Sequence, residues 1–151
     1  MDILVNRAEF VRATKMTDIY SVEKRSEIMS RVRSRNNSLE LAVRSKLHRA
    51  GFRFSLHRKD LPGTPDVVLR KYRVVVFVHG CFWHQHQGCS HASLPAQNVA
   101  FWASKLEGNK RRDSRVSRLL RSDGWHVITV WECEQKNGFA RLLRTMTRLA
   151  S

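Results

Sequence analysis

Four of the seven histidines and two of the three cysteines lie within thirteen residues, 79–91, and Cys133 follows much later in the chain. Thiolates with one imidazole form a ligand set that zinc prefers, and four protein ligands leave no open position for a substrate. We therefore predict a structural zinc site made of Cys81, His86, Cys89 and Cys133. Two alternatives stay open: His84 or His91 in place of His86, or unpaired cysteines with incidental histidines.

Asp66, His79 and His84 form a second group with chemical potential. Asp66 begins a predicted strand, and His79 ends the strand expected to pair with it through a hairpin, so both can reach one edge of a sheet. A carboxylate at a strand end can bind Mg²⁺, and a neutral imidazole can deprotonate an attacking water. Taken singly, each residue could instead be a turn-capping carboxylate or a surface imidazole; taken together, they predict a hydrolytic site.

Seven elements must position these groups. Apolar periodicity predicts a helix over residues 38–50, with Ser38 as its N-cap and Gly51 at its end. Strands are expected at 52–57, 66–70 and 73–79, the last of them central because it is apolar on both faces. A long helix over about 98–122, a strand at 125–131 and a final amphipathic helix marked by Phe139 to Leu149 complete the order α-β-β-β-α-β-α. This order predicts an α/β fold with a central mixed sheet flanked by helices.

The net charge of the chain indicates what kind of partner it binds. In 151 residues, 28 Lys and Arg stand against 13 Asp and Glu, which gives a net charge of +15 and an isoelectric point near 11.0. The length fits one domain, and the composition excludes disordered and fibrous classes. We predict a polyanion partner, a basic arm over residues 1–37 and a folded domain over 38–151. No apolar run is long enough for a membrane span and no secretory signal begins the chain, so we expect a cytoplasmic protein.

Five motifs resemble those of the very short patch repair (Vsr) DNA mismatch endonucleases. They are Leu61-Pro-Gly-Thr-Pro-Asp66, Phe77-Val-His-Gly-Cys-Phe-Trp-His84, Phe101-Trp102, Asn109-Lys-Arg-Arg-Asp113 and Gly124-Trp-His-Val-Ile-Thr-Val-Trp-Glu-Cys133. The resemblance implies a restriction-endonuclease-like fold, a structural zinc, and Mg²⁺-dependent nicking 5′ of the thymine in T:G mismatches that arise from deamination of 5-methylcytosine.

The resemblance also implies roles for single residues. Asp66 matches the aspartate that binds Mg²⁺, and Val78 matches a position whose backbone carbonyl does the same. His84 matches the histidine that activates water, and His79 the one that supports the attacked phosphate. Glu40 and Asp113 match supporting acids. The residues expected to contact DNA are Met29 of the arm, Phe82, Trp83, Trp102, Asn109, Lys110, Arg111, Arg112 and Arg115.

Aromatic side chains offer a physical route to mismatch selection. A T:G pair stacks and pairs less well than a Watson–Crick pair, so opening the duplex there costs less, and inserted rings recover part of the unstacking energy. Phe82 and Trp83 lie in a loop where no periodic apolar face is expected to receive them, so we interpret them as wedges. Trp102 has normal core spacing to Val99 and Leu106, so core and wedge both stay open.

We therefore expect a monomeric, zinc-stabilised, Mg²⁺-dependent mismatch nicking enzyme. Its partner is duplex DNA with a T:G mismatch, and a cytosine methyltransferase system and mismatch-repair or polymerase proteins are possible further partners. A restriction-like endonuclease that cuts intact duplex sites is the first alternative. A zinc-containing DNA-binding module without catalysis is the second, and the grouping of Asp66 with two histidines argues against it.

Overall fold

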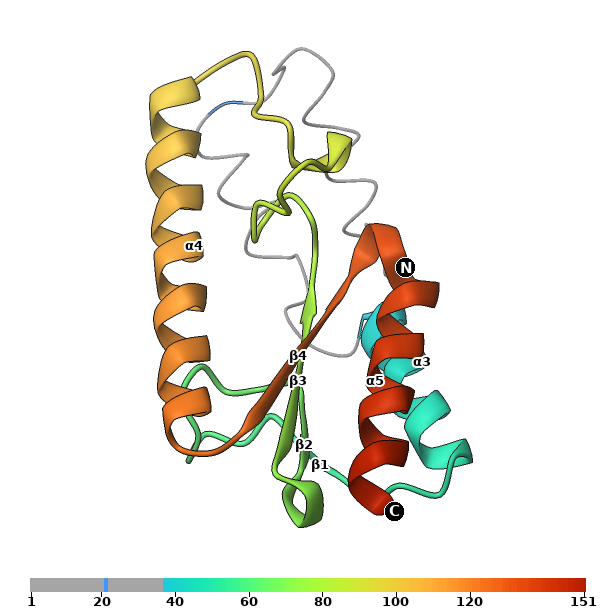
Figure 1. Ribbon diagram of the computed structural model, residues 1–151. Coiled ribbons are helices and arrows are strands. Elements are labelled where there is room, and N and C mark those ends of the chain that lie inside the picture. The colour runs from blue at the N-terminus through green and yellow to red at the C-terminus, as the bar shows by residue number, and fades with distance from the viewer. Residues whose placement is uncertain (1–20, 22–36) are drawn as a thin grey trace.

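The chain folds into three layers, with a sheet between helices (Figure 1). The computed structural model describes Ser21 and residues 37–151. The helices are α3 (Ser38–Arg49), α4 (Val99–Ser122) and α5 (Gln135–Ala150), and the strands are β1 (Ser55–Leu56), β2 (Val67–Leu69), β3 (Val74–His79) and β4 (His126–Trp131). The predicted α/β class and element order are confirmed.

The sheet is mixed, with strand order β1-β2-β3-β4. β1 and β2 run antiparallel to their neighbours, whereas β3 and β4 are parallel, with Val78 opposite Val130. A parallel pair requires a long crossover, and α4 supplies it. The central place of β3 is confirmed, since it pairs on both sides and five of its six residues are buried.

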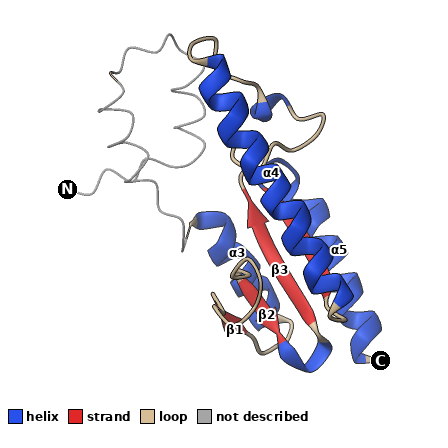
Figure 2. Cartoon of the chain, turned by 90° about the vertical axis from the view of Figure 1, so that its left-hand side faces the viewer, coloured by secondary structure: helices blue, strands red, loops and turns tan. Residues whose placement is uncertain are grey.

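Alternate residues of the strands supply the two halves of the core. Val67, Leu69 and Val76 pack with residues of α3 and α5, while Val68 and Val75 pack with residues of α4. Successive side chains of a strand point to opposite faces, so a run of valines contributes side chains to both halves of the core. Figure 2 shows α4 running alongside β3, and Figure 1 shows that α4 lies on the side of the sheet opposite α3 and α5.

Besides shifts of one residue at several element ends, three local features differ from the predictions. Asn37, not Ser38, caps α3, because its side-chain oxygen accepts a 2.8 Å hydrogen bond from the Glu40 amide. The strand predicted over 52–57 shortens to β1, since β2 offers only three residues to pair with. The predicted two-residue link of the β2–β3 hairpin is a 3₁₀ turn, Arg70–Tyr72, followed by Arg73 in the left-handed region.

The predicted N-terminal arm and the predicted absence of a membrane span are the remaining expectations. The arm predicted over residues 1–37, with Met29 in it, lies outside the described residues apart from Ser21 and Asn37. Within the described part, no helix combines the length and apolar character needed to cross a membrane.

Candidate active site

The site begins where β2 starts and β3 ends. Oδ2 of Asp66 accepts a 2.7 Å hydrogen bond from the Val78 amide. The register that places Val67 opposite Val76 would place Pro65 opposite Val78, and proline has no N–H to donate to the Val78 carbonyl. The carboxylate of Asp66 and the carbonyl of Val78 therefore both offer oxygen atoms at this end of the sheet, and hard cations such as Mg²⁺ prefer oxygen ligands.

The turn before Asp66 packs directly on α4. Gly63 has φ +72°, and a Cβ there would lie 2.4 Å from Cγ1 of Val116. Thr64 also has a positive φ, +48°. Only glycine allows this close approach without a shift of the Val116 side chain or of the turn. The turn thus docks the segment that carries Asp66, just before β2, against the helix that carries Asp113.

His84 lies between this helix and the end of β3. Its Nδ1 is 2.6 Å from Oδ2 of Asp113, and its ring stacks on that of His79 with centroids 3.7 Å apart and an interplanar angle of 2°. A carboxylate that binds Nδ1 favours the tautomer with the proton there, which leaves Nε2 able to accept one. The structure thus brings together the two histidines and the supporting acid that were expected to act together.

Glu40 lies on the other side of Asp66, together with a residue that the sequence analysis did not single out. Nε2 of His57 is 3.4 Å from Oε1 of Glu40, and Nδ1 of His57 is 3.9 Å from Oδ1 of Asp66. Arg44 contacts both Glu40, at 3.3 Å, and Nε2 of His57, at 3.1 Å. No local pattern marks His57, because its relation to Glu40 depends on how α3 packs beside the sheet.

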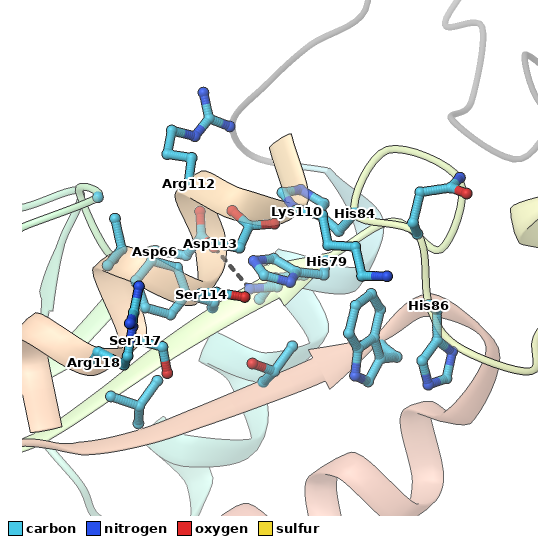
Figure 3. Close-up of a pocket in the computed structure, with 18 of the residues that line it drawn as sticks. Asp66, His79, His84, His86, Lys110, Arg112, Asp113, Ser114, Ser117 and Arg118 are labelled. Atoms are coloured by element: carbon cyan, nitrogen blue, oxygen red, sulfur yellow. Dashed lines mark hydrogen bonds and ion pairs between the residues drawn. The ribbon is translucent and has the colours of Figure 1, made fainter. Parts of the chain in front are cut away.

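Asp66, Val78, His79, His84 and Asp113 line one cavity of about 990 Å³. Figure 3 shows Asp66, His79, His84 and Asp113 in it, with Ser114, Ser117 and Arg118 along the adjoining stretch of α4. Lys110, Arg112 and Arg121 also line it. Of the basic residues predicted to contact DNA, Arg111 and Arg115 are exposed but do not line this cavity, and Arg111 pairs with Glu107 at 3.3 Å.

The cysteines gather at a separate cluster. Ligand atoms of Cys81, His86, Cys89 and Cys133 all lie within 4.8 Å of one another, and Nδ1 of His86 is 3.2 Å from Sγ of Cys133. His84 is engaged with Asp113 and does not join this cluster, and neither does His91. Three sulfurs and one imidazole at this spacing fit a tetrahedral zinc ion.

Burial raises the pKa of the Cys81 thiol and of the Cys133 thiol. The protonated thiols are therefore favoured while no cation is bound. A zinc ion would reverse this preference, since a coordinating thiol loses its proton.

The three aromatic residues pack against one another. Phe82, Trp83 and Trp102 are 0%, 8% and 1% exposed, and the ring centroid of Phe82 lies 5.2 Å from that of Trp83 and 5.5 Å from that of Trp102. The expectation that no apolar surface would receive Phe82 and Trp83 is wrong, because Trp102 of α4 forms part of that surface. Asn109, predicted to contact DNA, donates a 3.1 Å hydrogen bond to the Trp83 carbonyl and so ties this loop to α4.

Comparison with known proteins decides the family. The model of the family described as DNA mismatch endonuclease Vsr matches residues 17–91. A type II nicking enzyme, V.XorIIP, from Xanthomonas oryzae pv. oryzae is 53% identical over 119 residues, which cover 79% of this chain and 87% of the relative. The DNA mismatch endonuclease Vsr of Escherichia coli is 39% identical over 118 residues, covering 78% and 75%. This chain belongs to the Vsr family.

Membership of the Vsr family makes the chain an endodeoxyribonuclease that acts in DNA repair. A second nicking enzyme, V.NmeAIP from Neisseria meningitidis, is 43% identical and covers 81% of this chain and 86% of the relative. The Vsr match spans Asp66, His79 and His84, whereas Asp113 and Cys133 lie beyond it. The hydrogen bond to His84 is thus what ties Asp113 to the matched part of the site.

Proposed function

We propose that this chain is a Mg²⁺-dependent endonuclease that nicks one DNA strand 5′ of the thymine in a T:G mismatch left by deamination of 5-methylcytosine. The observation that carries the proposal is the His84–Asp113 pair, which faces the same basic cavity as Asp66 and His79. A water-activating base beside a cation-binding carboxylate is what hydrolysis of a phosphodiester needs.

Each residue that lines the cavity has its own role in the proposed hydrolysis. Asp66 and the Val78 carbonyl would hold Mg²⁺, which stabilises negative charge on the phosphate and on the leaving oxygen when bound. His84 accepts the proton of the attacking water at Nε2 while Asp113 holds its Nδ1. His79, stacked on His84, donates to an oxygen of the attacked phosphate. Lys110, Arg118 and Arg121 draw the DNA backbone into the cavity.

In this proposal, the aromatic cluster of Phe82, Trp83 and Trp102 selects the mismatch. The rings lie together at the loop after β3 and the first turns of α4. A T:G pair is the weaker step in a duplex, and rings placed between its bases replace part of the lost stacking. Because the rings are buried against one another, insertion requires the cluster to open toward DNA.

The zinc ligands support this arrangement from the side of β4. Trp131 stacks on His86 with centroids 4.1 Å apart, and it meets His79 edge to face at 5.2 Å. A zinc ion at Cys81, His86, Cys89 and Cys133 would hold His86 and thereby Trp131, which packs against His79. The metal is structural in this proposal, since no ligand position remains for water.

The enzyme acts as a monomer in the cytoplasm in this proposal, on DNA that a cytosine methyltransferase has modified. Mismatch-repair or polymerase proteins would act on the nick. These assignments rest on the likeness to the Vsr family and on the charge of the chain.

One assay separates this proposal from the alternatives. End-labelled duplexes with T:G, T:A or C:G at one position are incubated with the protein and Mg²⁺ or EDTA. We expect a single nick in the thymine strand of the T:G duplex, with Mg²⁺ only, and its loss in Asp66→Ala. Equal cutting of matched duplexes would identify a restriction-like enzyme, and tight binding without a nick would identify a non-catalytic DNA-binding module.

A further inference from the structure

His57 has a left-handed backbone conformation. It follows β1 directly and has φ +45°, in the left-handed region that non-glycine residues seldom adopt. Its amide donates a 3.4 Å hydrogen bond to the Asp66 carbonyl. Such conformations persist where the surrounding structure over-determines them, and they cluster at functional sites.

The imidazole of His57 stands between two carboxylates. Nε2 is 3.4 Å from Oε1 of Glu40, and Nδ1 is 3.9 Å from Oδ1 of Asp66. The Glu40 side chain is only 1% exposed, and Arg44, 3.3 Å away, partly balances its charge. A buried charge is tolerated only when it is paired and hydrogen-bonded, so this packing fixes the ring in place.

Asp66 is thereby approached from two sides. Its Oδ2 accepts from the Val78 amide at 2.7 Å, and its Oδ1 faces His57. With both oxygens facing protein groups, the carboxylate is restrained from rotating about its Cβ–Cγ bond. Among the described residues that line the cavity, Asp66 is present but His57 and Glu40 are not. His57 thus contacts the lining of the cavity at Asp66.

We propose that His57 is a positioning residue that presets the Asp66 carboxylate for a divalent cation. The inference rests on the proposed function, in which Asp66 holds Mg²⁺. Residues that orient metal-binding groups are worth about 10–100-fold in metal affinity. Loss of the His57 ring should weaken cation binding by about that factor and leave affinity for DNA in EDTA unchanged.

A pair of variants, both of which tolerate the left-handed backbone of His57, tests this. His57→Gly removes the ring but tolerates the left-handed conformation, and His57→Asn tolerates it too while its amide reaches the place of Nδ1. We measure Mn²⁺ binding from the electron paramagnetic resonance signal of the free ion, with Asp66→Ala as the background. His48→Ala, at an exposed histidine of α3, is the matched control.

We expect His57→Gly to raise the Mn²⁺ dissociation constant, and the Mg²⁺ concentration for half-maximal nicking, by about 10-fold or more. His57→Asn should restore both to within about threefold, and His48→Ala should change neither. DNA affinity in EDTA should stay near that of the wild type in all three variants. His57→Gly and His57→Asn should both lower the melting temperature, because each removes the imidazole beside the buried Glu40 carboxylate, whereas His48→Ala should not.

The outcomes distinguish this inference from the proposed function. If Asp66→Ala binds Mn²⁺ as well as the wild type, the proposed cation site fails and the inference fails with it. If Asp66→Ala loses the ion but His57→Gly keeps wild-type affinity, only the inference is overturned. Equal losses in His57→Gly and His57→Asn would overturn it as well, because a group at the place of Nδ1 would then have no effect.

Discussion

Nδ1 of His84 lies 2.6 Å from Oδ2 of Asp113, and this contact joins the loop after β3 to α4. The two residues are far apart in sequence, and Asp113 is half-buried in the helix wall of the cavity. A carboxylate in this place fixes both the orientation and the tautomer of the imidazole.

Asp113→Asn should therefore slow nicking without weakening DNA binding. An amide can turn its NH₂ toward Nδ1 and favour the wrong tautomer, so we expect a single-turnover rate lower by about 10–100-fold. The measurement is nicking of a T:G duplex at saturating enzyme, beside an equilibrium binding assay in EDTA. Arg111→Ala, an exposed position of the same helix outside the cavity, is the control and should keep its rate. An unchanged rate in Asp113→Asn would remove Asp113 from the mechanism.

Metal analysis tests the cysteine cluster. The purified protein should hold about one zinc per chain, and a strong chelator should lower the melting temperature as well as activity, because binding free energy at a structural site is folding free energy. His86→Ala should lose the metal, whereas His91→Ala should keep it, since only His86 lies within the cluster. A folded, active protein without zinc contradicts the site, and loss of zinc in His91→Ala contradicts the choice of histidine.

Two substitutions in the aromatic cluster should have different effects, one on stability and one on mismatch preference. Trp102→Ala removes a ring that is 1% exposed, and such truncations lower the free energy of unfolding by about 3–5 kcal/mol. Trp83→Ala should lose the preference for T:G over T:A duplexes, because stacking is worth about 1–3 kcal/mol per base, while phosphate contacts remain. Urea denaturation and paired binding assays measure the two effects. If Trp83→Ala unfolds more easily yet keeps its full preference, Trp83 is a core residue and no wedge.

Some parts of this molecule could be predicted from the sequence because the signal is local. The apolar runs of β3 and β4 and the long repeat of α4 mark their own positions, and Asp66 and His79 follow from the hairpin that joins their strands. The cysteine cluster could be predicted from residue types alone, once one of the nearby histidines was chosen as the fourth member. In each case the neighbours in sequence determine the outcome.

The errors arise where the answer depends on a distant partner. The limits of β1 depend on the small number of residues in β2 that can pair with it. The burial of Phe82 depends on Trp102, which lies later in the chain in α4. His57 ends the strand predicted over 52–57, and that prediction gives it no role. Its place beside Glu40 follows from the packing of α3, which periodicity does not describe.

Gly63 should be intolerant of even one methyl group. Alanine at φ +72° costs about 1–2 kcal/mol, and its Cβ would lie 2.4 Å from Val116, an overlap that adds about 1–3 kcal/mol. We expect Gly63→Ala to lower the free energy of unfolding and to slow nicking, since Asp66 follows this turn. Gly108→Ala is the control, because its Cβ would meet nothing within 4 Å and alanine favours a helix. Wild-type stability and rate in Gly63→Ala would show that the turn can move off α4 at no cost.

The arginines of α4 should differ in their contribution to DNA binding. Both Arg118 and Arg111 are exposed, but only Arg118 lines the cavity, and Arg111 pairs with Glu107. Each phosphate contact releases condensed counterions, so Arg118→Ala should reduce the slope of log affinity against log salt concentration by about 0.9. Arg111→Ala removes the same charge from the same helix and should leave the slope nearly unchanged. Binding of a T:G duplex in EDTA at several salt concentrations measures both slopes. Equal reductions would mean that the net charge of α4 attracts DNA without regard to the cavity, and the path proposed for the DNA backbone would be wrong.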